Sequence, residues 1–370
     1  MADVLLAGGG TAGHVNPLLA TAALLRARGH TVAALGTEQG LEADLVPRAD
    51  VPLLTIPRVP LPRRLSGDLA RLPLNLQRAV RESARAIDAS GADVVVGFGG
   101  YVSAPAYMAA RRRRIPWVVH EANARPGFAN RWGARGAAGV AVTFPGTPLP
   151  GATLTGLPLR PDIRRLADAL ADGGGHAVRA DARARLGWPA DAPTLLVTGG
   201  SLGAASLNAA TAGAVGALVE RGIHVLHLTG RGKSQEAEAV REALDPAVRG
   251  RYLVQEYAHD MATAFAAADA VVCRAGAATV SEISALGIPA VYVPLPHGNG
   301  EQALNARPAV DAGAAVLVAD ADLTPDVLHE HAQRLVLDAD ARAAAVAATA
   351  SIGIRDGAER LVAMIEGAVG

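Results

Sequence analysis

The chain has 370 residues, too many for one ordinary hydrophobic core and enough for two domains. Half of the residues are hydrophobic, and the only cysteine, Cys273, excludes an intramolecular disulfide and a Cys-x-x-Cys metal site. With 35 basic and 35 acidic residues the formal net charge is zero, so the charge balance gives no support for nucleic acid as a partner.

The first residues, MADVLLAGGGTAGHV, lack the basic region of a signal peptide and enter a strand and a glycine turn directly. No run of 18 or more apolar residues occurs, so we expect no membrane-spanning helix. Any contact with a membrane would then be peripheral.

Short apolar runs alternate with helix-length segments along the chain, a pattern typical of parallel strands covered by helices on both faces. The predicted strands are Val4–Ala7, Thr31–Leu35, Val94–Gly97, Trp117–His120, Gly139–Thr143, Thr194–Thr198, His224–Leu228, Ala270–Cys273, Ala290–Val293 and Ala315–Val318. The crossovers between them should be right-handed. The sequence therefore predicts the α/β class.

The two halves of the chain open alike, each with a strand, a glycine-rich turn and a helix ended by Gly29 or Gly222. We predict two similar doubly wound domains, residues 1–162 and 163–350, with the linker near 158–168. A C-terminal helix over 351–370 could pack back on the first domain.

The first glycine turn, Gly8-x-Gly10-x-x-Gly13, matches the dinucleotide fingerprint and could present backbone N–H groups to a phosphate. That fingerprint also needs an acidic residue at the end of the second strand. Here Gly36-Thr37 stands there and Glu38 lies beyond it, which disfavours nicotinamide or flavin binding.

His14 follows this turn at the carboxyl edge of the predicted sheet, where ligands bind in open α/β folds. It could take a proton from a sugar hydroxyl, or it could be a histidine held by a loop carbonyl. Further glycine or polar clusters at strand ends are Gly97-Phe98-Gly99-Gly100-Tyr101 and His120-Glu121-Ala122-Asn123, followed by Asn130.

In the second half, small residues from Arg274 to Ser281 follow a strand and would let a diphosphate approach a helix start. We place Glu282 in the first helical turn, where it could accept hydrogen bonds from ribose hydroxyls or simply complement the helix dipole. Gln302 and Asn305 share one helix face, as a ligand anchor or as an ordinary polar face.

Several formal motifs are rejected. Gly230-Arg231-Gly232-Lys233-Ser234 resembles the end of a P-loop, but His227 stands where the first glycine is required. Two Asp-x-Asp patterns, at 320–322 and 338–340, lie in Ala- and Asp-rich stretches, and no set of residues has zinc-like spacing, so no metal ligand is assigned.

A basic, leucine-studded segment covers residues 58–85 and suggests contact with anionic lipid headgroups, although a solvated helix face is the alternative. Its arginines are Arg58, Arg63, Arg64, Arg71, Arg78, Arg81 and Arg85, and the run Arg111–Arg114 adds more positive charge.

Six segments, in order along nearly the whole chain, together resemble the MurG family of bacterial N-acetylglucosaminyltransferases. They are GGGTAGHVNP, GFGGYVSAPAYMAA, IPWVVHEANARPGFANRW, VTGGSLGAASLN, VVCRAGAATVSEISALGIPAVYVPLP and HGNGEQALNA. The resemblance implies a GT-B fold, two Rossmann-like domains facing a cleft. It also implies peptidoglycan synthesis, with roles in cell shape and division.

The implied reaction transfers N-acetylglucosamine from UDP-GlcNAc to the 4-hydroxyl of the muramic acid of lipid I, with inversion, giving lipid II. UDP-GlcNAc is then a substrate rather than a cofactor, and no motif for an assisting divalent ion is present. The implied location is the cytoplasmic face of the cell membrane, against an anionic surface, with other proteins of cell-wall synthesis as partners.

The resemblance also implies roles for residues. His14 would be the base, with Glu121 as the second candidate, and the acceptor side would include Tyr101, His120 and Asn130. The implied donor contacts are Thr11, Ala12, Gly13, Asn123, Arg160, Ser201, Ala258, Ala277, Ala278, Thr279, Val280, Ser281, Glu282 and Gln302, with Asn305 beside them.

Three positions depart from the family pattern: Ala12 replaces a glycine, Leu202 replaces a glutamine, and Glu301 precedes Gln302 where many relatives have two glutamines. The Leu202 change puts a side-chain contact at that position in doubt, and the Glu301 change could alter how the sugar hydroxyls are recognised. Rival interpretations are another GT-B enzyme with a lipid or natural-product acceptor, a UDP-GlcNAc 2-epimerase and a non-catalytic nucleotide-binding regulator.

Overall fold

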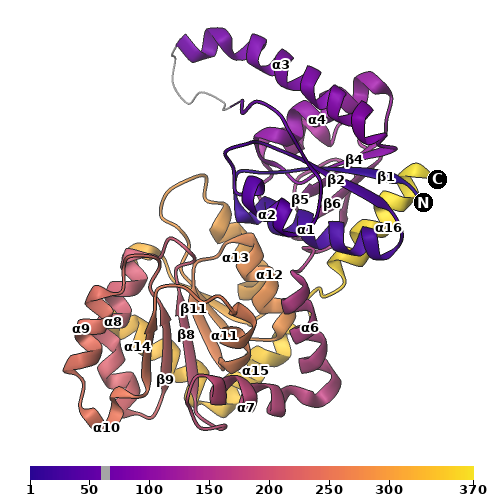
Figure 1. Ribbon diagram of the computed structural model, residues 1–370. Coiled ribbons are helices and arrows are strands. Elements are labelled where there is room, and N and C mark those ends of the chain that lie inside the picture. Colours follow the sequence, from indigo (N-terminus) through magenta and orange to yellow (C-terminus); the bar gives the residue numbers. More distant parts are fainter. Residues whose placement is uncertain (60–66) are drawn as a thin grey trace. The chain divides into compact units, whose positions relative to one another are not determined.

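The computed structural model describes residues 1–59 and 67–370, and of residues 67–71 only the backbone (Figure 1). The chain forms two compact units. Unit 1 contains Met1–Pro161 together with Ile354–Gly370, and unit 2 contains Asp162–Gly353. Arg63 and Arg64 of the predicted basic segment lie outside the described residues, as does the side chain of Arg71.

Unit 1 is built on a seven-stranded sheet in which all strand pairs are parallel, in the order β3-β2-β1-β4-β5-β6-β7. Its strands are β1 Asp3–Ala7, β2 Thr31–Gly36, β3 Leu53–Thr55, β4 Val94–Gly97, β5 Trp117–Glu121, β6 Gly139–Val142 and β7 Ala152–Leu154. Its helices are α1 Ala12–Ala27, α2 Glu42–Arg48, α3 Gly67–Ser90, α4 Gly100–Arg113, α5 Phe128–Gly133 and α16 Gly357–Val369.

Alternation along β1 sends side chains to the two faces of this sheet. Val4 and Leu6 belong to a core beneath α1 and α16, whereas Leu5 and Ala7 belong to a core beneath α3 and α4. Both cores are almost fully buried, which explains why these strands read as uninterrupted apolar runs.

The end of the chain returns to unit 1. Helix α16 packs against α1 and against β4, β5 and β6, and the yellow α16 lies beside the indigo α1 in Figure 1. Leu361, Val362 and Ile365 are the buried residues that anchor it in the core beneath α1.

Unit 2 contains a six-stranded parallel sheet in the order β10-β9-β8-β11-β12-β13. The strands are β8 Thr194–Thr198, β9 His224–Leu228, β10 Tyr252–Gln255, β11 Ala270–Cys273, β12 Ala290–Tyr292 and β13 Ala315–Leu317. The helices are α6 Pro161–Ala169, η1 Leu170–Gly174, α7 Gly175–Arg185, α8 Ala205–Glu220, α9 Gln235–Ala243, α10 Pro246–Arg249, α11 Met261–Ala267, α12 Ala277–Leu286, α13 Glu301–Asp311, η2 Asp320–Asp322, α14 Pro325–Leu337 and α15 Ala339–Thr349.

Each of the ten predicted strands is present, within one residue at either end, and the predicted α/β class with two parallel sheets is confirmed. The strands β3, β7 and β10 were not predicted from the sequence. All three are edge strands, and β7 is exposed at all three residues. An edge strand has fewer neighbours to bury it, so its apolar signal is weak.

The strand order reverses between β1 and β4 in unit 1 and between β8 and β11 in unit 2. At such a point two loops leave the sheet in opposite directions and open a crevice at the carboxyl ends of the strands. Within the described part of the chain, no helix is both long and apolar enough to cross a membrane.

Candidate active site

The glycine turn after β1 leads directly into α1, and His14 lies in the first turn of that helix. Its Nδ1 is 3.1 Å from the carbonyl oxygen of Gly9 and 3.2 Å from Oγ1 of Thr11. The Thr11 hydroxyl can donate or accept, whereas a carbonyl oxygen can only accept, so the tautomer with its proton on Nδ1 is the one that satisfies both contacts. The other nitrogen, Nε2, then carries the lone pair that can accept a proton.

The loop after β4 covers the His14 ring closely. A Cβ at Gly99 would lie 3.0 Å from Nε2 of His14, and one at Gly100 would lie 2.6 Å from the Gly9 carbonyl oxygen. Both glycines also have positive φ, +99° and +77°. The loop can therefore approach the histidine only because neither residue has a side chain.

A buried polar layer lies at the end of β5. The amide Nδ2 of Asn130 donates to the carbonyl oxygen of His120 and to Oε2 of Glu121, each at 3.0 Å, and Oδ1 accepts from the Tyr107 hydroxyl at 2.8 Å. The side chains of His120, Glu121 and Asn130 are all at most 3% exposed. The structure thus brings these three predicted residues together.

Glu121 also holds the loop that follows β5. Its Oε1 accepts from the Asn123 backbone N–H at 2.9 Å, and its Oε2 accepts from the Gly127 backbone N–H at 3.0 Å. Both carboxylate oxygens are therefore engaged in fixing local structure, in contrast to Nε2 of His14.

His120 is fully buried, and among the described residues neither ring nitrogen has a hydrogen-bond partner. Burial lowers the pKa of His120 to about 4; the nearby Gly156 backbone opposes this shift, and His14 adds to it. The ring is consequently neutral at physiological pH.

Glu42, the first residue of α2, was not predicted from the sequence as a site residue, and it is completely buried. Its Oε2 accepts from the Gly10 backbone N–H at 2.8 Å, and its Oε1 accepts from the N–H and the hydroxyl of Thr37 at 3.0 and 2.7 Å. The dinucleotide fingerprint requires an acidic residue at the end of the second strand. Glu42 instead reaches back to the glycine turn from the following helix.

A cavity of about 290 Å³ lies beside this turn. Its walls include Gly9, Gly10, Glu42 and Tyr101, and the guanidinium of Arg58 lies 5.2 Å from the centre of the Tyr101 ring. Tyr101 is 39% exposed, so an aromatic face and a cation border the glycine turn.

In unit 2 the glycine loop after β8 presents Ser201 and Leu202 at the surface, and Leu202 is 81% exposed. The rejected P-loop segment supports this loop, because Nζ of Lys233 donates to the Leu202 carbonyl oxygen at 2.7 Å. His227 is buried in β9, with its ring nitrogens 2.8 Å from the Tyr252 hydroxyl and 3.1 Å from Oδ1 of Asn208.

Arg274 follows β11 and joins several elements at this edge of the sheet. Its guanidinium donates to the carbonyl oxygens of Val293 and Pro294, to the Ser206 hydroxyl and to Asp320. Burial raises the pKa of Asp320, but the bonds from Ser206 and Arg274 outweigh it and hold that pKa below its ordinary value. Asp320, from a rejected Asp-x-Asp pattern, therefore pairs with an arginine.

Helix α12 begins at Ala277 with Gly276 as its N-cap, so the small residues Ala277 to Ser281 form its start, as predicted. Glu282, however, is the sixth residue and lies in the second turn, which corrects its predicted place in the first. The early start follows from Gly276, whose extended backbone can precede a helix directly.

On α13, Gln302 and Asn305 lie within one turn but differ in exposure. Oε1 of Gln302 accepts from the Leu295 backbone N–H at 3.0 Å, whereas the fully buried Asn305 donates to the Ala275 carbonyl oxygen at 3.3 Å. Asn305 therefore supports the loop before α12. Ala258, which follows the end of β10, is 8% exposed.

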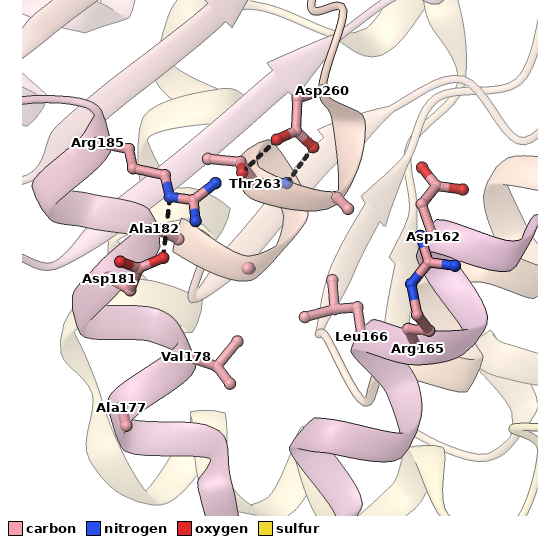
Figure 2. Close-up of a pocket in the computed structure, with 12 residues that line it drawn as sticks. Asp162, Arg165, Leu166, Ala177, Val178, Asp181, Ala182, Arg185, Asp260 and Thr263 are labelled. Atoms are coloured by element: carbon pink, nitrogen blue, oxygen red, sulfur yellow. Dashed lines mark hydrogen bonds and ion pairs between the residues drawn. The ribbon is translucent and has the colours of Figure 1, made fainter.

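A second hollow, of about 720 Å³, lies in unit 2 between α6, α7 and α11 (Figure 2). Figure 2 shows Leu166 and Val178 facing it, with Asp162 and Arg165 at one side and Asp181 and Arg185 at the other. None of the residues predicted for the site lines it.

The predicted residues thus form two groups, one per unit. Those of unit 1 are Thr11, Ala12, Gly13, His14, Tyr101, His120, Glu121, Asn123, Asn130 and Arg160, and those of unit 2 are Ser201, Ala258, Ala277, Ala278, Thr279, Val280, Ser281, Glu282, Gln302 and Asn305. Most of them lie at or just beyond the carboxyl ends of strands, where an open α/β sheet binds ligands.

Comparison with known proteins identifies the family. Residues 4–142 match the glycosyltransferase family 28 N-terminal domain, and residues 194–361 match its C-terminal domain. A relative from Clavibacter michiganensis is 52% identical over 100% of this chain and 97% of its own length. It is named UDP-N-acetylglucosamine–N-acetylmuramyl-(pentapeptide) pyrophosphoryl-undecaprenol N-acetylglucosamine transferase. The crystal structure of Acinetobacter baumannii MurG covers 98% of this chain and 99% of its own, with a TM-score of 0.76 at 30% identity.

The chain belongs to the MurG family. The fold extends beyond this family. A UDP-GlcNAc 2-epimerase from Neisseria meningitidis has a TM-score of 0.67 over 98% of this chain, but only 13% of its residues are identical. That likeness shows the shared GT-B fold alone, whereas the likeness to MurG family members extends to the sequence of the whole chain.

Proposed function

We propose that this protein transfers N-acetylglucosamine from UDP-GlcNAc to the 4-hydroxyl of the muramic acid of lipid I, forming lipid II in peptidoglycan synthesis. The supporting observation is the full-length, 52% identical relative that is named for this transfer. Each of the two parallel sheets has glycine loops where its strand order reverses, and such loops can bind phosphate groups through backbone N–H groups. Two such sheets are suited to a reaction in which both the donor and the acceptor carry a diphosphate.

The reaction is a single displacement with inversion. The acceptor 4-oxygen bonds to the anomeric carbon, the bond from that carbon to the UDP oxygen breaks, and UDP leaves with the electron pair. His14 accepts the proton of the hydroxyl through Nε2, because Nδ1 is committed to the Gly9 carbonyl oxygen. Glu121 is less suited as the base, because both of its oxygens already hold the loop after β5.

In unit 2 we propose that the exposed loop at Ser201 and the start of α12 contact the diphosphate of the donor. At the start of α12 the backbone N–H groups would bind it. Glu282 binds the ribose hydroxyls of the donor. Ala258 contacts the uracil ring of the donor through its backbone. Gln302 completes this side, with Asn305 fixing the loop before α12.

Unit 1 supplies the acceptor side through Tyr101 and the layer formed by His120 and Asn130. The residues proposed to reach the donor from unit 1 are Thr11, Ala12, Gly13, Asn123 and Arg160. Among these, the guanidinium of Arg160 would offset phosphate charge as UDP departs.

The deciding experiment measures label transfer from UDP-GlcNAc to a short-chain lipid I analogue. We expect transfer to lipid I, little with UDP-galactose or diacylglycerol, and no conversion of UDP-GlcNAc without an acceptor. Equal transfer to diacylglycerol would indicate another glycosyltransferase, and acceptor-free conversion would indicate an epimerase. Full transfer by His14→Ala would remove His14 as the base.

We further propose that the protein acts at the cytoplasmic face of the membrane, bound peripherally through α3 to anionic lipid. In the described part of α3, Arg78 and Arg81 are exposed, and Leu74 is 69% exposed. Cations beside an exposed leucine are suited to anionic headgroups. We propose that it also contacts other proteins of cell-wall synthesis at this membrane surface.

Replacing Arg78 and Arg81 by serine should reduce binding to phosphatidylglycerol vesicles severalfold at low salt, as measured by sedimentation. The matched control replaces Arg221 and Arg307, two exposed arginines of unit 2, and should leave binding unchanged. Equal losses in the two double variants would point to net charge rather than to this helix.

A further inference from the structure

The peptide group between Gly9 and Gly10 is hydrogen-bonded at both ends to ionisable side chains. Its N–H, which belongs to Gly10, donates to Oε2 of Glu42 at 2.8 Å. Its carbonyl oxygen, which belongs to Gly9, accepts from Nδ1 of His14 at 3.1 Å. A single peptide unit therefore connects a buried carboxylate to the imidazole of the proposed base.

We propose that Glu42 is a positioning residue that acts on His14 through the Gly9–Gly10 peptide; this rests on the proposed role of His14 as the base. A carboxylate that accepts from an N–H polarises the peptide and makes its carbonyl oxygen a stronger acceptor. The stronger acceptor holds the Nδ1–H tautomer and stabilises the imidazolium that forms when Nε2 takes a proton.

The local structure keeps the Glu42 carboxylate charged and in place. Burial raises the pKa of Glu42, but the hydrogen bonds from the Gly10 backbone and from Thr37 outweigh it and hold the pKa below its ordinary value. The charge is therefore present throughout the pH range in which a histidine titrates.

Three glycines make room for this carboxylate. A Cβ at Gly9, Gly36 or Gly40 would lie 2.1 to 2.5 Å from side-chain atoms of Glu42. The turn after β1, the end of β2 and the loop before α2 thus close around the same group. This arrangement leaves the carboxylate no room to swing away from the Gly10 N–H.

Several other ionisable groups lie near His14, and Asp44 and Arg58 line the cavity beside its glycine turn. Neutral His120 lies close enough to feel its charge, and Glu121 and Tyr107 lie behind the amide of Asn130. Arg58 stacks on Tyr101 at the nearby cavity. In the described part of the chain, the His14 ring hydrogen-bonds only to Gly9 and Thr11.

The test compares Glu42→Gln with the wild type across pH in the lipid I transfer assay. Loss of the negative charge makes the imidazolium less stable, so the acidic limb of kcat/KM should move to lower pH, on the order of one unit. The weaker base should lower kcat about 10-fold to 100-fold. The KM for UDP-GlcNAc should stay within about twofold.

Thr37→Val is the matched control, because it removes one hydrogen bond from the same carboxylate but keeps the charge and the Gly10 contact. The Thr37→Val protein should be destabilised about as much as the Glu42→Gln protein. The acidic limb of its kcat/KM profile should stay at the wild-type pH. A second measurement needs no variant to fold: histidine ¹⁵N shifts of the wild-type protein should show His14 as the Nδ1–H tautomer.

The outcomes separate this inference from the proposed function. If His14→Ala abolishes transfer but Glu42→Gln keeps the wild-type acidic limb, the role of Glu42 is overturned and the base assignment stands. An equal displacement of that limb in Thr37→Val, or an Nε2–H tautomer in the wild type, also overturns it. If His14→Ala transfers normally, the base assignment itself fails.

Discussion

At the scale of single residues, Asn130 shows why an amide is needed in a buried polar layer. Its Nδ2 donates to the Glu121 carboxylate and to the His120 carbonyl oxygen, while its Oδ1 accepts from Tyr107. Burial raises the pKa of Tyr107 well above its ordinary value, so its hydroxyl remains a donor. Only a side chain with both a donor and an acceptor satisfies these neighbours.

Asn130→Asp should therefore destabilise unit 1 by about 2–4 kcal/mol at pH 7, because it sets a second carboxylate against Glu121. Repulsion raises the folded-state pKa of the introduced Asp carboxyl, so stability is lost as pH rises and recovered as pH falls. Urea unfolding at pH 5 and pH 7.5 should show the smaller loss at pH 5. Tyr107→Phe, the control, should lose about 1 kcal/mol at both values; a pH-independent loss in Asn130→Asp would contradict this explanation.

At the scale of secondary-structure elements, Arg274 connects the carboxyl edge of the second sheet. It lies at the end of β11 and binds the end of β12, the start of α8 through Ser206, and η2 through Asp320. The Arg274 and Asp320 side chains are only 13% and 19% exposed, so this pair is shielded from solvent far more than most on the surface. It holds in register the loops proposed to bind the donor.

We expect Arg274→Ala and Asp320→Ala each to lower the unfolding free energy of unit 2 by about 1–3 kcal/mol, since each leaves a partner unsatisfied. The double variant should lose less than the sum of the two, as measured in a double-mutant cycle by chemical denaturation. Arg307→Ala removes an ion pair with Asp311 that is mostly exposed to solvent. It should leave the midpoint of chemical denaturation unchanged. Strict additivity would mean that Arg274 and Asp320 act independently.

At the scale of the whole molecule, the chain crosses from unit 1 to unit 2 once and then returns. The boundaries fall after Pro161 and after Gly353, so the last 17 residues complete the first unit. Leu361 is fully buried in the core beneath α1, although it lies more than 300 residues further along the chain. The stability of unit 1 therefore depends on the chain's end.

Leu361→Ala should lower the unfolding free energy of unit 1 by about 2–5 kcal/mol through the cavity that it leaves. Hydrogen exchange by mass spectrometry should show faster exchange in β1, β4 and α1 and unchanged exchange in β8 and β9. Leu328→Ala, at a fully buried site of α14, is the corresponding control in the other unit. It should make exchange faster in unit 2 and leave unit 1 unchanged. Faster exchange in unit 2 upon Leu361→Ala would show that the two units do not respond separately.

The sequence by itself was sufficient for the α/β class, ten of the thirteen described strands, the glycine turns and the resemblance to the MurG family. These follow from local information: a strand buried on both faces must be apolar along its length, and a turn with positive φ selects glycine. The placement of His14 after the first turn is local in the same way, because the turn and α1 are adjacent in the chain.

Only the tertiary structure decided what the polar residues contact. Glu42 lies 32 residues after Gly10, and Asp320 lies 46 residues after Arg274, so no spacing rule links either pair. The edge strands β3, β7 and β10 were not predicted, because their own residues carry only a weak strand pattern. They form strands by pairing with the neighbouring strand of the sheet. Hydrogen bonds between distant segments depend on how the sheets bring loop ends together, which local periodicity does not encode.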